Sequence, residues 1–80
     1  MERSTEELKK EGEEIAKKLG NGVIYNGPWL DDGSLDDGSE GKLVFHTFTD
    51  AAETGTTFVA KTLKQAKQRL MKKRKMYNAP

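Results

Sequence analysis

Basic side chains dominate one stretch near the end of the chain. The segment KTLKQAKQRLMKKRK, residues 61–75, carries eight of the fourteen lysines and arginines and no acidic residue. Like charges repel one another, so their concentration on one segment favours contact with a polyanion whose counterions are released on binding. We expect non-catalytic nucleic-acid binding through phosphates by these residues: Lys61, Lys64, Lys67, Arg69, Lys72, Lys73, Arg74 and Lys75.

The same stretch has other interpretations. Its last lysines would complement the dipole of a solvated helix without any partner. An acidic protein groove or an anionic membrane would also attract it. In a eukaryotic protein the run KKRK, residues 72–75, would serve as a nuclear address. The pattern does not distinguish RNA from DNA, or a single strand from a duplex.

Catalytic chemistry has few candidate residues. His46 is the only histidine and the chain has no cysteine, so neither a cysteine–histidine pair nor a site with two imidazoles can form. Paired carboxylates occur in DDGSLDDGSEG, residues 31–41, where no apolar residue pattern would hold them rigidly enough for acid–base work. The spacing there also fails the EF-hand pattern. We therefore expect no enzymatic activity, no cofactor and no metal.

The acidic segment 31–41 is typical of a mobile loop, because it has almost nothing to bury. An alternative is that it shields the basic segment as a mimic of a polyanion. The tail, residues 76–80, is also expected to be mobile.

The first helix is predicted from about Thr5 to Leu19. Ser4 and Glu7 form a capping-box pattern at its start, and Gly20 follows its end. Gly12 lies inside the helix, where glycine costs about 1 kcal/mol relative to alanine. Either the helix is frayed there or another element approaches Gly12 closely, and we expect the close approach.

The basic segment is predicted to form the second helix. Thr62 and Gln65 form another capping-box pattern at its start. The apolar stripe that is expected to pack contains Leu63, Ala66, Leu70 and Tyr77. Arg74 interrupts this stripe, so the last turn of the helix is expected to project from the body.

Three short strands are predicted at Val23–Tyr25, Lys42–Thr49 and Thr56–Lys61, the last two as a hairpin. If Thr49 lies opposite Thr56, alternation divides the hairpin into two faces. The face expected in the core carries Leu43, Phe45, Thr47, Phe58 and Ala60. Trp29 is also expected in the core, since a chain of this size needs its large apolar groups inside.

The other face of the hairpin is predicted to be an apolar patch on the surface. It would suit a partner strand, a second copy of the chain or stacked bases. Its candidate residues are Val44, His46, Phe48 and Val59. This patch, or the basic helix against an acidic partner, would make the chain a small protein-interaction or inhibitory module instead.

These elements predict a single small α+β domain spanning residues 1–80, with the order αβββα and two helices packed on one face of an antiparallel three-stranded sheet. Double-stranded RNA-binding domains share this layout, and the lysine- and alanine-rich segment 61–70 is similar to their second helix. The segments GPWLDDG and KLVFHTFT carry none of that family's other signatures. The shared layout therefore implies no function by itself.

Hydropathy excludes one further class. No apolar run approaches the roughly 18 residues that span a bilayer, and the start MERSTEELKK is acidic and polar where a secretory signal would be basic and then apolar. We expect a cytoplasmic protein without a membrane partner. Its net charge is +1, but every charged residue after Glu53 is basic.

Overall fold

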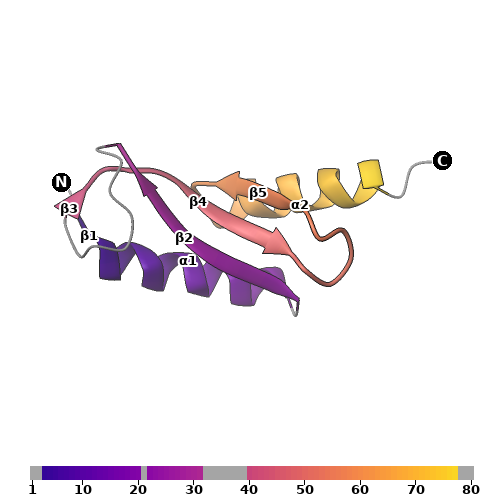
Figure 1. Ribbon diagram of the computed structural model, residues 1–80, viewed down its shortest axis with the longest axis horizontal. Coiled ribbons are helices and arrows are strands. Elements are labelled where there is room, and N and C mark those ends of the chain that lie inside the picture. The colour runs from indigo at the N-terminus through magenta and orange to yellow at the C-terminus, as the bar shows by residue number, and fades with distance from the viewer. Residues whose placement is uncertain (1–2, 21, 32–39, 78–80) are drawn as a thin grey trace.

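The computed structural model of the protein describes residues 3–20, 22–31 and 40–77. Its main elements follow the order helix, three strands, helix (Figure 1), and confirm the predicted α+β class. They are α1 (Thr5–Leu19), β2 (Val23–Leu30), β4 (Leu43–Asp50), β5 (Thr57–Ala60) and α2 (Leu63–Tyr77). Two further short strands, β1 (Arg3–Ser4) and β3 (Glu40–Gly41), pair with each other in antiparallel fashion.

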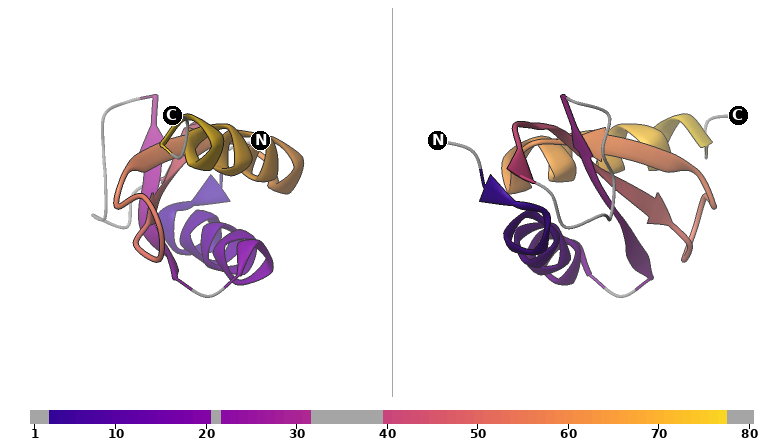
Figure 2. Two further views of the ribbon diagram at one scale, coloured as in Figure 1. Left: turned by 90° about the vertical axis from the view of Figure 1, so that its right-hand side faces the viewer. Right: turned by 60° about the vertical axis from the view of Figure 1, so that its left-hand side comes forward.

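The three main strands form an antiparallel sheet in the order β2-β4-β5. Both helices lie on the same face of this sheet (Figure 2, left), with α1 against β2 and α2 against β5. Apolar side chains of the two helices and of the inward face of the sheet meet between the layers. This core consists of Ile15, Ala16, Phe48, Phe58, Ala60, Ala66 and Leu70.

Helix α1 has the predicted bounds and start. The Ser4 hydroxyl accepts a hydrogen bond of 3.3 Å from the backbone N–H of Glu7, which satisfies one of the donors left free at a helix start. Tyr25 on β2 lies over Gly12, and a Cβ atom at Gly12 would overlap the tyrosine ring. The expected close approach at Gly12 is therefore confirmed.

The predicted register of the β4–β5 hairpin is wrong by one residue. Thr49 pairs with Thr57, and Asp50 continues β4 because its N–H donates to the carbonyl oxygen of Thr56 at 2.9 Å. Gly55, with a φ of 67°, closes the turn in the left-handed region that glycine adopts without strain. A shift of one residue moves every side chain of one strand to the other face.

The predicted surface patch therefore does not exist as one face. His46 and Phe48 are fully buried at 0% exposure, under the helices, and Val44 is half-buried. Val59 is exposed, but it lies on the opposite side of the sheet. The prediction that Trp29 is buried is also wrong, because 43% of this residue is exposed.

Two predictions concern residues near the limits of the described chain. The prediction that segment 31–41 is mobile and free of metal falls mainly on residues 32–39, which lie outside the described residues, and so do residues 78–80 of the predicted tail. Within the described part, Glu40–Gly41 forms β3, and α2 extends to Tyr77. Neither described helix is long and apolar enough to cross a bilayer.

Candidate functional site

Helix α2 begins with the predicted capping interactions. The Thr62 hydroxyl accepts from the Gln65 N–H at 3.2 Å, and the Gln65 side chain accepts from the Lys61 N–H at 2.9 Å. Ala66 and Leu70 are buried against the sheet and Leu63 is half-buried. Tyr77 is 61% exposed, so its predicted place in the packed stripe is wrong.

Seven of the eight candidate cations lie on the exposed surface around this packed stripe. None of the seven makes an ion pair with the residues that the structure describes. They are Lys61, Lys64, Lys67, Arg69, Lys72, Lys73 and Lys75. The result is a helix surface whose positive charge is open to solvent, and this surface is called the α2 cationic surface below.

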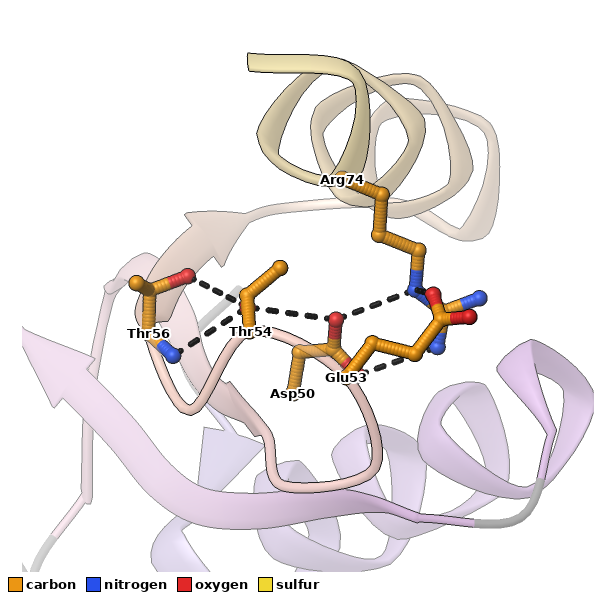
Figure 3. A network of polar contacts seen from close by, with 5 residues as sticks. All are labelled: Asp50, Glu53, Thr54, Thr56 and Arg74. Atoms are coloured by element: carbon orange, nitrogen blue, oxygen red, sulfur yellow. Dashed lines mark hydrogen bonds and ion pairs between the residues drawn. The ribbon is translucent and has the colours of Figure 1, made fainter. Parts of the chain in front are cut away.

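Arg74, the eighth candidate, has a different role (Figure 3). Its Nε and Nη2 donate to the two carboxylate oxygens of Asp50, each at 3.0 Å, and its Nε lies 2.6 Å from a carboxylate oxygen of Glu53. Asp50 is fully buried and also accepts from the Thr54 hydroxyl at 3.2 Å. We call this group the Asp50–Arg74 clamp.

The clamp changes two predictions. Arg74 is occupied by carboxylates and does not belong to the α2 cationic surface. The last turn of α2 was expected to project from the body, and this is wrong because the clamp ties it to the end of β4 through Asp50 and to the following turn through Glu53. A fork-to-fork pair of this kind adds geometric specificity as well as attraction.

The clamp predicts a dependence of stability on pH. The two hydrogen bonds from Arg74 are the main reason that the pKa of Asp50 lies below its ordinary value of 3.8. A lowered carboxyl pKa contributes stability that is present above the unfolded pKa, about pH 4, and is lost as the pH falls through the folded value. We expect the midpoint of urea-induced unfolding to fall as the pH is lowered through this range. The Asp50→Asn variant should be less stable than the wild type at neutral pH, but its stability should fall less on acidification. An equal fall in both proteins would contradict the role of the Asp50 carboxylate in this pH dependence.

A groove lies between the edge strand β5 and α2, beside the cationic surface. Its volume is about 470 Å³. Arg69 is one of its lining residues, and its Nη1 donates to the backbone carbonyl of Val59 at 2.7 Å. Its walls are formed by Thr57, Phe58, Val59, Arg69, Lys72, Lys73 and Met76, and so combine apolar surface with three cations. A larger hollow of about 590 Å³ lies along α1, and the described residues that line it fall within residues 4–13 and include three glutamates.

The face of the sheet away from the helices carries aromatic side chains. Trp29 on β2 pairs with Phe45 on β4, and their rings are stacked with centroids 5.9 Å apart and planes 8° from parallel. Ile24 and Val59 are exposed on the strands to either side of β4. The sequence predicted both Trp29 and Phe45 in the core; the correct hairpin register would have placed Phe45 on this face, but it carries no information about Trp29 on β2.

A buried polar network fills the space between α1 and the sheet. The Tyr25 hydroxyl lies 2.7 Å from Nδ1 of His46, and Nε2 of His46 lies 2.9 Å from a carboxylate oxygen of Glu11. An imidazole with its proton on Nε2 donates to Glu11 and accepts from Tyr25. The carboxylate of Glu11 is partly exposed, whereas His46 is fully buried. The network satisfies His46 inside the fold and thus explains why a histidine occupies an inward position of β4.

The sequence matches no family model, and neither a curated protein nor a solved structure is similar to it.

Proposed function

We propose that this chain is a non-catalytic nucleic-acid-binding domain whose α2 cationic surface contacts phosphates. The observation that carries the proposal is the set of seven exposed cations on and beside α2, without an ion pair to any described residue. Their mutual repulsion destabilises the folded state, and phosphates would relieve it while releasing counterions.

The distribution of acidic residues also favours binding on the α2 side of the molecule. Helix α1 carries five glutamates, four of them exposed, and four lysines, whereas α2 carries seven bases and no acid. A polyanion would be attracted to α2 and repelled from the glutamates of α1. The molecule therefore has one preferred side for a phosphate backbone, and the basic groove beside β5 continues that side.

Reversing three lysines should remove this binding. The variant Lys64→Glu, Lys67→Glu and Lys72→Glu is expected to bind neither RNA nor DNA oligonucleotides, as measured by fluorescence anisotropy at about 50 mM salt. Its far-ultraviolet circular dichroism should match that of the wild type, since all three side chains are exposed. A matched control with the same change in net charge is Lys10→Glu, Lys17→Glu and Lys18→Glu on α1, where the side chains are also exposed.

The control triple should retain most of the binding. Equal losses in both triples would mean that net charge alone attracts the oligonucleotide. The wild-type affinity should fall linearly with the logarithm of the salt concentration, with a slope of up to about −6 for seven phosphate contacts on a duplex. Removing one lysine should reduce the slope by about one unit. If no oligonucleotide binds at low salt, the proposal is wrong, and an acidic protein partner becomes the better candidate.

A further inference from the structure

We propose that the nucleic acid is single-stranded and that one of its bases stacks on the aromatic pair Trp29 and Phe45. This inference rests on the proposed function and adds a second contact surface to it. In the resulting arrangement, phosphates lie on the α2 cationic surface and bases reach the face of the sheet that the helices do not cover.

The geometry of the aromatic pair favours a third ring. The Trp29 and Phe45 rings are nearly parallel, and Trp29 is 43% exposed although it is the largest apolar residue of the chain. Trp29 lies on β2, an edge strand, so no further strand lies beside it within the three-stranded sheet. Stacking of a base on an aromatic ring contributes about 1–3 kcal/mol and tolerates any base, because every base has a π face.

The register of the sheet connects this pair to the basic helix. His46 pairs with Ala60, the last residue of β5, and Lys61 follows Ala60 directly. Trp29 and Phe45 are thus neighbours across β2 and β4, and Lys61 lies at the end of the third strand, where the chain turns into α2. Adjacent strands are about 4.8 Å apart, so the path from Trp29 to Lys61 is about 10 Å. This distance corresponds to about three nucleotides at the 3.4 Å rise of a stacked strand.

The chemistry around the pair fits a polyanion with exposed bases. The outward positions of the three strands carry hydroxyl, amide, apolar and aromatic side chains, among them Asn26, Thr47, Thr49, Thr57 and Val59. Asp31, two residues after Trp29, is also exposed. In a duplex the bases are already stacked inside the helix, so only phosphates would be available to this protein. A single strand can offer both its phosphates and its ring faces.

The experiment compares a single strand with its duplex. Oligonucleotides of about 16 nucleotides cover the largest site expected for one small domain. Trp29 is the only tryptophan, so a single strand should quench its fluorescence in the wild type, whereas the duplex should not. Replacing Trp29 with alanine should lower single-strand affinity about 5- to 150-fold, which corresponds to the loss of one stacked base, and leave duplex affinity unchanged.

Two control variants separate stacking from general damage to this face. Ile24→Ala removes another exposed apolar side chain of β2 and should not change affinity for either form. Trp29→Phe keeps a ring and should restore most of the affinity that alanine loses. Melting curves of all three variants should show a folded protein, because both side chains are exposed.

Each remaining outcome decides the matter. Equal affinity for the two forms, without an effect of Trp29→Ala, would overturn this inference and leave the phosphate-binding proposal intact. Absence of binding to both forms at low salt would overturn both. If sedimentation shows self-association that Trp29→Ala abolishes, the aromatic pair is an interface between copies of the chain, and the inference is wrong.

Discussion

Replacing Arg74 with alanine is expected to destabilise the protein by about 3 kcal/mol or more, because it leaves the buried Asp50 carboxylate without its cation. Asp50 is fully buried, and the two 3.0 Å hydrogen bonds from Arg74 are its main compensation. The loss is a large fraction of the total, since small domains unfold at a cost of only about 5–15 kcal/mol. Urea unfolding followed by circular dichroism measures it.

Three comparison variants make this result specific. Lys75→Ala changes the neighbouring base on α2, which is exposed and outside the clamp, and should cost less than about 0.5 kcal/mol. Arg74→Lys keeps the charge but loses the two-pronged geometry, so it should lie between the alanine variant and the wild type. Replacing Asp50 and Arg74 together with leucine should recover much of the lost stability, because no unpaired charge then stays buried. An alanine variant as stable as Lys75→Ala would refute the clamp.

The substitution Gly12→Ala is expected to destabilise the protein by about 2 kcal/mol, although alanine is the better helix former by about 1 kcal/mol. The added Cβ would overlap the Tyr25 ring. That ring cannot move without cost, because its hydroxyl is the partner of the buried His46 and its face contacts Phe48. A buried nitrogen without a partner costs about 1–3 kcal/mol, so the packing conflict outweighs the gain in helix propensity.

A double-mutant cycle tests this explanation. In a Tyr25→Ala background the overlap is absent, and Gly12→Ala should then be neutral or stabilising by up to about 1 kcal/mol. The change of sign between the two backgrounds is the expected signature. If Gly12→Ala destabilises both backgrounds equally, the cost comes from the helix itself and not from the tyrosine.

Local signals in the sequence predicted the helices and the order of the elements well. The Ser4 and Thr62 caps start both helices where their hydroxyl groups suggested, and the glycine inside α1 marked a true close approach. These features depend on residues within a few positions of each other. The α2 cationic surface was also predictable, apart from Arg74, because a run of bases without acids needs no tertiary information.

Long-range pairing was the part that sequence patterns could not supply. Asp50 was assigned to the polar turn, since an aspartate at the end of a strand normally faces water. It instead extends β4 inward because Arg74, twenty-four positions later, pairs with its carboxylate. With Thr49 opposite Thr57 instead of Thr56, His46 and Phe48 lie in the core, and Phe45 lies on the other face beside Trp29. The difference of one residue in the register thus accounts for both errors about the faces of the hairpin.

The two edges of the sheet also bear on how this protein behaves at high concentration. An exposed strand edge offers unpaired backbone groups that can recruit another chain and begin aggregation. On β5 the edge is only four residues long, and Arg69 already occupies the carbonyl of Val59. On β2 the edge contains a register irregularity between Tyr25 and Gly27, followed by Pro28, which has no N–H to donate. Both edges are therefore poor templates for the addition of a strand from another chain, even though the aromatic face between them is open to solvent.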